Sequence, residues 1–239
     1  MAATAISGLT GSVTFASGYT TLVDRWTAAL NATMQDITAF SPTSSHQALA
    51  TSGLVTGGEG TYHCKLAVPS TALFTGPYAG FPESWTLRST MTPREVTILG
   101  GTWKSYVGGL LSSEIELRAW VEDTTALPIA GTTGSAVLTA VTGQYYTVTY
   151  VMNSVDVEID VDNPEGHILT TRGSTSAIPE VTGALPLPNA TGSATFVAYT
   201  GRQYGGTIFI TSVLAQVNRR TGIGGIDVGF VWSSTITPG

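Results

Sequence analysis

The chain is short of charge. Only 11% of its 239 residues are charged, whereas about a quarter are charged in an ordinary globular domain. Lysine occurs only at Lys65 and Lys104, and the formal net charge is −6. A protein that wraps a phosphate backbone needs a basic surface, so this composition argues against that class of nucleic-acid binder. One physical reason for so little charge is a surface covered by neighbouring subunits, because interface cores are depleted of charge.

Cysteine is scarcer still. Cys64 is the single cysteine, which excludes an intramolecular disulfide and a zinc site built from cysteines. It lies in a strand-like run, and we expect a buried thiol that packs as a small hydrophobic group. The chain shows no basic segment followed by an apolar stretch and no long uncharged apolar run. We therefore expect a protein made in a cytoplasm, without a membrane partner.

Motifs of catalysis are missing as well. The three histidines, His46, His63 and His167, lie far apart and are not spaced as ligands of one metal ion. The chain has no Gly-x-Ser-x-Gly sequence, no phosphate-binding loop and no His-Glu-x-x-His sequence. We expect no enzymatic activity, no cofactor and no catalytic residue.

Turn-forming and β-branched residues are plentiful. The chain has 28 glycines and 11 prolines, together with many threonine, serine and valine residues, which is typical of strands joined by tight turns. Residues 114–121 alternate between polar and apolar side chains, as a half-buried strand does. We predict an all-β fold with at most one or two short helices. The best helical candidate is the segment 43–50.

Two stretches of the chain occur twice. Residues 26–40 are echoed by residues 85–99, so that Trp26 matches Trp85 at an offset of 59 positions. Because these two tryptophans are equivalent, we expect a shared packing role rather than carbohydrate stacking. Residues 134–143 are echoed by residues 192–201, and Tyr146 matches Tyr204 at an offset of 58. Repeats of this kind indicate a duplicated supersecondary unit.

The order of the repeats allows two domain arrangements. The chain has two N-terminal units followed by two C-terminal units, and a loop-like stretch at 172–189 separates the last two. In one arrangement, a continuous domain at 71–185 is nested inside a discontinuous domain made of 1–70 and 186–239. Pairing the first unit with the third and the second with the fourth would serve equally well.

These repeats resemble the major tail (tail tube) protein family of long-tailed phages. The N-terminal half of that family has a tryptophan-centred strand, an acid–aliphatic–threonine step like the one in residues 36–40, and a Gly-Leu pair before a final strand. Its later half has a Thr-Gly-x-x-Tyr turn like residues 200–204, followed by an apolar strand like residues 208–213. The resemblance covers most of residues 11–237.

The resemblance implies two tail-tube-like units, each a β-sandwich or β-barrel. In the family, sheets join side by side into rings, and the rings stack into a tube through which DNA passes without specific binding. Members usually carry one unit and form hexamers, so this chain would form either a trimeric pseudo-hexamer or a hexamer. The implied partners are further copies of the chain and other tail proteins, and the implied location is the virion tail.

Four acidic residues form the sharpest local pattern. Asp156, Glu158, Asp160 and Asp162 alternate with aliphatic residues, so all four lie on one face of a predicted strand. Carboxylates so close together repel one another unless they are solvated or counter-charged. We interpret them as an acidic face of the tube lumen. A calcium site that includes Asp160 and Asp162, and an ordinary solvated face, are the alternatives.

Aromatic residues in predicted loops are candidates for contacts between subunits. Trp103 and Tyr106 lie in the polar loop of the second N-terminal unit, and Phe74 and Tyr78 lie in the glycine- and proline-rich connection at 69–82.

Two other functions fit a pair of small β units. One is a capsid decoration or cement protein, which usually needs the capsid lattice to assemble. The other is a receptor- or glycan-binding β-sandwich of a tail fibre, which would stay a small oligomer. A tube protein differs from both because it polymerises alone.

Overall fold

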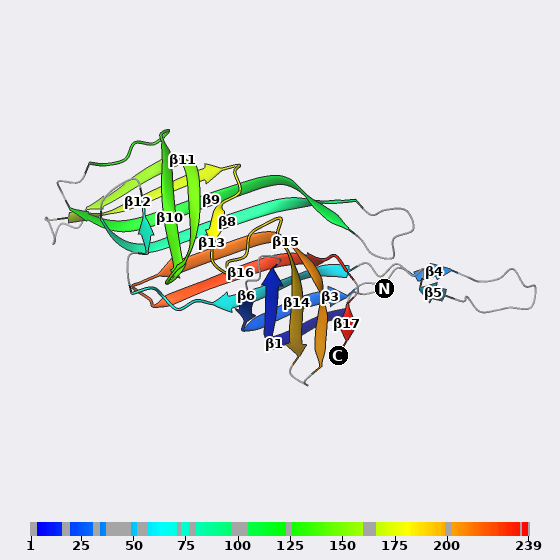
Figure 1. The fold of residues 1–239 in the computed structure, drawn as a ribbon. Helices are drawn as coiled ribbons and strands as arrows, with labels where there is room; N and C mark the ends of the chain where they lie inside the picture. The colour runs from blue at the N-terminus through cyan, green and yellow to red at the C-terminus, as the bar shows by residue number, and fades with distance from the viewer. Residues whose placement is uncertain are drawn as a thin grey trace, which may run out of the picture.

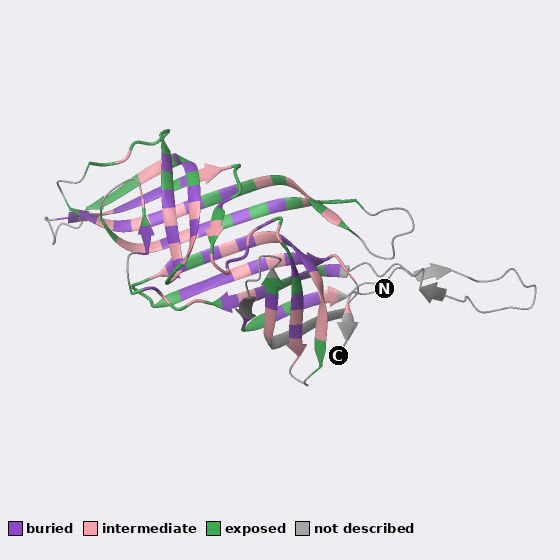
Figure 2. Cartoon of the chain, in the orientation of Figure 1, coloured by how far each residue is buried: buried purple, intermediate pink, exposed green. Residues whose placement is uncertain are grey.

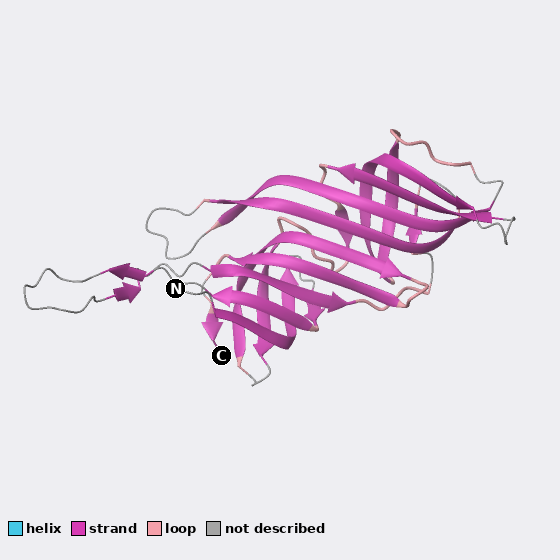
Figure 3. Ribbon diagram, turned by 180° about the vertical axis from the view of Figure 1, so that it is seen from behind, coloured by secondary structure: helices cyan, strands magenta, loops and turns pink. Residues whose placement is uncertain are grey.

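The computed structural model describes most of the chain as β-strand. The described residues are 4–15, 20–30, 34–36, 49–51, 57–70, 73–76, 80–96, 105–122, 126–159, 166–198, 202–234 and 236–238. They contain strands β1 to β17 and no helix, so the all-β prediction is confirmed (Figure 3). No helix long and apolar enough to span a membrane occurs among them. The predicted helical segment 43–50 lies outside the described residues except for Leu49 and Ala50, which belong to strand β5.

One group of strands, unit 1, closes on itself. Its strands are β1 (Thr4–Phe15), β3 (Arg25–Leu30), β6 (Gly57–Lys65), β14 (Thr191–Ala198), β15 (Gln203–Asn218) and β16 (Ile223–Trp232). They pair in the order β14-β1-β3-β6-β16-β15, and β14 also pairs with β15. The six strands therefore form a closed barrel. Strands β2 (Thr20–Val23) and β17 (Thr237–Pro238) pair with β1 and β15.

A second group, unit 2, repeats this order with the middle of the chain. Its strands are β7 (Phe74–Thr75), β8 (Phe81–Glu95), β9 (Tyr106–Glu122), β10 (Thr133–Val141), β11 (Gln144–Ile159) and β12 (Gly166–Thr175). They pair in the order β8-β9-β12-β11-β10-β7, and β13 (Glu180–Thr182) pairs with β11. Strands β4 (Met34–Asp36) and β5 (Leu49–Thr51) form a separate small sheet.

The two units share one continuous sheet. Residues 212–218 of β15 pair with residues 84–90 of β8, and Figure 1 shows these strands side by side where the units meet. The strands of unit 1 come from 1–70 and 186–239, and those of unit 2 come from 71–185. This is the grouping expected for the nested arrangement. Its division into two domains stays a prediction, because the sheet and the buried cluster run through both units.

The two repeated tryptophans make the same contacts. Trp26 Nε1 donates a hydrogen bond to the carbonyl of Val197 (3.1 Å), and Trp85 Nε1 donates one to the carbonyl of Thr139 (3.2 Å). The two acceptors are 58 positions apart, which is the offset of the C-terminal repeat. The shared packing role is therefore confirmed. Each tryptophan links one N-terminal repeat to one C-terminal repeat.

The aromatic neighbours of the tryptophans are equivalent too. The ring of Trp26 lies 6.1 Å from that of Tyr204, and the ring of Trp85 lies 6.3 Å from that of Tyr146, both edge to face. The first N-terminal repeat thus packs with the last C-terminal repeat, and the second N-terminal repeat packs with the first C-terminal repeat.

Cys64 is buried in unit 1, as predicted. Its side chain is 2% exposed. Burial raises the pKa of the Cys64 thiol to about 12, with smaller contributions from the carboxylates of Asp24 and Asp227. The thiol therefore stays protonated in the folded chain at neutral pH.

Candidate functional site

Eight consecutive strands of the sheet carry one polar face. In the order β3-β6-β16-β15-β8-β9-β12-β11, four strands come from each unit. Along most of these strands, buried side chains alternate with more exposed ones, as Figure 2 shows by colour, whereas β12 and β16 carry runs of buried residues. Because strand side chains point alternately to the two faces, one face of this layer packs on the core and the other is polar.

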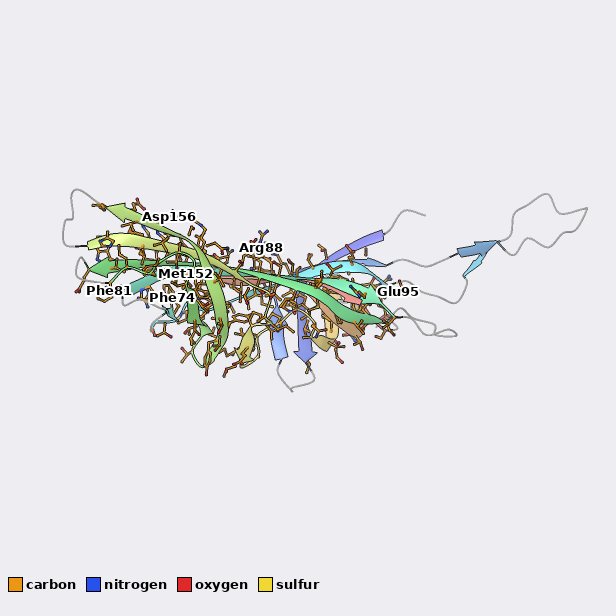
Figure 4. The ribbon with its side chains drawn as sticks, turned by 90° about the horizontal axis from the view of Figure 1, so that it is seen from above. Phe74, Phe81, Arg88, Glu95, Met152 and Asp156 are labelled. Carbon is orange, nitrogen blue, oxygen red and sulfur yellow. The ribbon has the colours of Figure 1, made fainter. Side chains whose placement is uncertain are left out.

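The members of this polar face are fixed by strand register. Gln216 of β15 lies opposite Thr86 of β8, which lies opposite Glu116 of β9, and Glu116 lies opposite Arg172 of β12. The same parity places further side chains on the face: Thr27, Thr61, His63, Asp227, Arg88, Thr90, Glu114, Arg118, Thr170, Asp156 and Glu158. Figure 4 shows Asp156 and Arg88 on the same side of the long strands.

Two arginines form ion pairs with the acidic residues of β11. Arg172 donates from Nε to Glu116 Oε2 (2.7 Å) and from Nη1 to Asp156 Oδ2. Arg118 donates from Nε to Glu83 Oε2 (3.1 Å) and from Nη2 to Glu158 Oε2 (3.3 Å). Each guanidinium therefore bridges two carboxylates. The hydrogen bond to Glu116, followed by the charge of Glu116, raises the pKa of Arg172 above its ordinary value.

These contacts describe two of the four acidic residues singled out in the sequence. Asp156 and Glu158 share one face of β11, and their side chains are 61% and 69% exposed. They are counter-charged by Arg172 and Arg118 rather than left to repel each other. Asp160 and Asp162 lie outside the described residues. Whether this face lines a lumen stays a prediction.

The counter-charges were not recognised from the sequence. Arg118 alternates with Glu114 and Glu116, so its place on the same face was visible in the period-two pattern. Arg172 was assigned to a loop-like stretch beginning at that residue, whereas β12 continues to Thr175 and β13 follows at 180–182. The run Gly173-Ser174-Thr175 has the composition of a turn. In the structure it is the end of β12 and pairs with β11 on one side and β9 on the other, so composition alone gave the wrong prediction.

The unit 1 part of the face carries shorter and sparser polar groups. His63 Nδ1 lies 2.6 Å from Asp24 Oδ1, and the hydroxyls of Thr27 and Thr61 are hydrogen-bonded at 2.8 Å. Arg25 lies 3.5 Å from Asp227 in an exposed pair. These groups pair with one another across the sheet, and this part of the face has no cluster of cations among the described residues.

Carboxylates outnumber cations on the face. Among the described residues on or bonded to it, the acidic residues outnumber the cationic ones. The cations include Arg25, Lys65, Arg88, Arg118 and Arg172, and the acids include Asp24, Glu59, Glu83, Glu114, Glu116, Glu122, Asp156, Glu158 and Asp227. The field over this face is weakly negative.

Shallow grooves follow the junction of the units. One is lined by Thr61, Arg88 and Asp227 among others, and a neighbouring one by Glu114, Glu116 and Arg172 among others. Both are lined by a mixture of charged, polar and apolar side chains, with Leu214 in each. In the part of the chain that the structure describes, no three His, Cys, Asp or Glu side chains are grouped as metal ligands would be.

One candidate contact residue is corrected by the structure. Phe74 is 4% exposed, lies in β7 and pairs with Leu138 of β10, so its ring belongs to the core and is not available to another subunit. The Gly76-Pro77 pair that follows in the sequence suggested a loop, but Phe74 and Thr75 form a two-residue strand. Tyr106 is half-buried against Phe209, with ring centres 6.4 Å apart. Trp103 and Tyr78 lie outside the described residues.

Comparison with protein-family models, with curated proteins and with solved structures gives no match to the chain.

Proposed function

We propose that the chain is a structural virion protein that assembles with copies of itself into stacked rings, forming the tail tube of a long-tailed phage. The observation that carries the proposal is the eight-stranded layer. Two equivalent units each contribute four neighbouring strands, and the layer presents one continuous polar face. A curved layer of this kind, extended from copy to copy, would line a channel.

The charges of the face suit DNA that passes without adhering. Each phosphate neutralised by a free Lys or Arg strengthens adhesion. Arg118 and Arg172 are each occupied by two carboxylates, and charge-assisted pairs of this kind compete with phosphate for the same donors. A weakly negative lining would therefore repel the DNA backbone slightly and bind it at no fixed place.

The duplication supports a ring with few chains. Three chains would place six equivalent units around a channel, and six chains would place twelve units or put one unit of each chain outside. In the proposed virion, other tail proteins would cap the tube, and the chain would be made in the host cytoplasm before assembly.

The deciding experiment is negative-stain electron microscopy of the purified chain across a concentration series. Rings or hollow tubes are the expected result, and end views would give the rotational symmetry. A uniformly small particle at every concentration would overturn the proposal. Such a particle would favour a capsid cement protein if it bound only to capsids, or a tail-fibre module if it bound glycans.

A second experiment tests the face itself. Tubes of the double variant Asp156→Lys and Glu158→Lys should retain duplex DNA at low salt, and the binding should fall steeply as salt rises. The control carries Ser135→Lys and Glu180→Lys, both at exposed positions away from the polar face, and should retain much less. Equal retention by both variants would show that the face does not contact DNA.

A further inference from the structure

One strand of unit 2 has an open edge. Residues 144–151 of β11 pair with β10, whereas residues 151–159 pair with β12 on the opposite side. Backbone bonds with residues 131 and 132 extend the first side to Met152. Beyond that point, residues 154–159 have no strand partner on the β10 side among the described residues. An uncovered edge of this length is a template for another strand.

The apolar side chains along this edge are exposed although they face the core side. Val157 lies opposite Leu169, which is fully buried, yet Val157 is 42% exposed. Ile159 is 72% exposed. Side chains directly opposite one another share a face of the sheet, so Val157 and Ile159 point to the core side of the sheet. Their exposure shows that little in the described part of the chain covers them.

The repeat shows what is missing. Ala215 and Val217, which lie 58 positions after Val157 and Ile159, are both 0% exposed. They are covered because β15 pairs with β8, which places Leu87 opposite Ala215 and Trp85 opposite Val217. The equivalent of β15 in unit 2 is β11, so β11 lacks the partner that β8 supplies to β15.

The equivalent of β8 in unit 1 is β3, because Trp26 corresponds to Trp85. The single β3 of a chain lies at the other end of its eight-strand layer, so only a second copy can present a β3 to β11. In the free chain, residues 4–8 of β1 occupy the edge of β3, with Gly8 opposite Trp26 and Ser7 opposite Thr27.

We propose that β11 of one copy pairs antiparallel with β3 of a second copy, in the register of the β15–β8 junction and in place of residues 4–8. The inference rests on the proposed ring function and specifies its interface. The register follows from the β15–β8 pairing, with 58 subtracted from each β15 position and 59 from each β8 position. It places Val157 opposite Ala28, Glu158 opposite Thr27 and Ile159 opposite Trp26. Each chain then has one donor edge and one acceptor edge, which is the head-to-tail arrangement that closes into rings.

Residues 4–8 act in this scheme as a removable cover. They satisfy the edge of β3 until a neighbour arrives, which protects the free chain from random strand addition. The pairing they give up is replaced by an equivalent ladder with β11. The gain on assembly is the burial of Val157 and Ile159.

Disulfide trapping tests the register. The double variant Thr27→Cys and Glu158→Cys should form a reducible ladder of dimers and higher oligomers under mild oxidation, because opposite residues in an antiparallel pair lie at disulfide distance. Both positions are exposed in the free chain. Each single variant should form no ladder, since Cys64 is buried and its pKa is raised to about 12. Thr27→Cys with Asp156→Cys, two residues out of register, should link far less.

Electron microscopy of the same samples separates the two proposals. Rings without a ladder would overturn the β11–β3 interface and leave the tube function standing. A ladder without rings or tubes would keep the interface and overturn the tube. Absence of both would overturn both, and equal linking by the out-of-register pair would overturn the register.

A side-chain variant provides an independent test. Ile159→Lys should raise the concentration needed for assembly at least about tenfold, because the interface would lose the burial of an isoleucine and would have to bury a charged group instead. Ile159 is 72% exposed in the free chain, so the variant should fold normally. The matched control is Ile129→Lys, at a loop position that is 70% exposed, which should assemble as the wild type does. Equal defects in both variants, or none in either, would overturn the interface.

Discussion

The two units have the same strand order but different core side chains. In unit 1 the core is aromatic: Phe196 packs on Trp26 and on Phe230, with ring centres 5.2 and 5.3 Å apart. The position equivalent to Phe196 in unit 2 is Leu138, and both are fully buried. The strand order and the tryptophan hydrogen bond are kept. Topology and one polar contact therefore define the unit, and its core has been repacked.

A glycine shows how the repacking is balanced. Phe230 of β16 corresponds to Gly173 of β12, and Ile208 of β15 corresponds to Tyr150 of β11. A Cβ atom on Gly173 would lie 2.3 Å from the Tyr150 ring, so the larger residue at one position requires the smaller at its neighbour. In a close-packed core, a large ring at one position leaves room only for a small residue beside it.

The largest expected effect comes from truncating the two equivalent core positions. Phe196→Ala should lower the free energy of unfolding by about 4 kcal/mol and Leu138→Ala by about 3 kcal/mol. The difference arises because Phe196 also loses its ring pairs with Trp26 and Phe230. Urea unfolding measures both values, and Ile129→Ala at an exposed position should change little. A larger loss for Leu138→Ala would show that the aromatic cluster adds nothing beyond its volume.

Two buried tyrosines should respond in opposite directions. Tyr146 Oη donates to the carbonyl of Pro186 at 3.1 Å, so Tyr146→Phe should cost about 1 kcal/mol. Tyr62 Oη is buried and has no hydrogen-bond partner among the described residues. Tyr62→Phe should therefore be neutral or stabilise the chain by about 1 kcal/mol, because it removes an unpaired polar group. Thermal unfolding of both variants tests the contrast, and a clear loss in Tyr62→Phe would reveal a partner for its hydroxyl.

Alkaline pH should weaken unit 1 through Cys64. The pKa of the Cys64 thiol is raised to about 12 in the folded chain from its ordinary value of 9.0, so between these values the unfolded state releases its proton and the folded state does not. Stability is therefore full below about pH 9 and falls as pH rises toward 12. At pH 10, Cys64→Ala should have lost about 1 kcal/mol less than the wild type, relative to pH 7. Ala119 occupies the equivalent position in unit 2 and is buried there, so the fold tolerates an alanine at this position. Parallel pH profiles for both proteins would contradict the burial argument.

Part of this architecture was readable from the sequence. The period-two pattern at 114–121 predicted the face that Glu116 and Arg118 share, and the offset of the repeats predicted that Trp26 and Trp85 pack alike. Which repeat pairs with which was not readable. A constant offset shows that two segments are equivalent. Which segment each of them pairs with depends on contacts between residues far apart in the sequence, and the offset carries no information about those contacts.

The errors have local causes. Phe74 was placed in a loop because two paired residues directly before Gly76-Pro77 carry no periodic signal. Arg172 was placed in a loop because β12 ends in small polar residues. Strands this short, or this poor in apolar residues, are held by their neighbours on the sheet rather than by their own propensity.

The smallest expected effect concerns the charges of the polar face, where the units differ again. Arg172 is 49% exposed and bridges Glu116 and Asp156, whereas Gly229 stands at the corresponding position of unit 1. At low salt, Arg172→Met should cost about 0.5 kcal/mol, because it leaves two neighbouring carboxylates unopposed and exposed pairs contribute little. Arg25→Met, which breaks the single exposed pair with Asp227, should cost less. Both losses should shrink in 1 M salt, and urea titrations at two salt concentrations measure them. A loss of several kcal/mol for Arg172→Met would mean that the network holds the sheet together. A loss near the expected value would mean that the network contributes little to stability and instead sets the charge of the surface. Arg118 and Arg172 each reduce the repulsion between two acids, and the face still keeps a negative net charge.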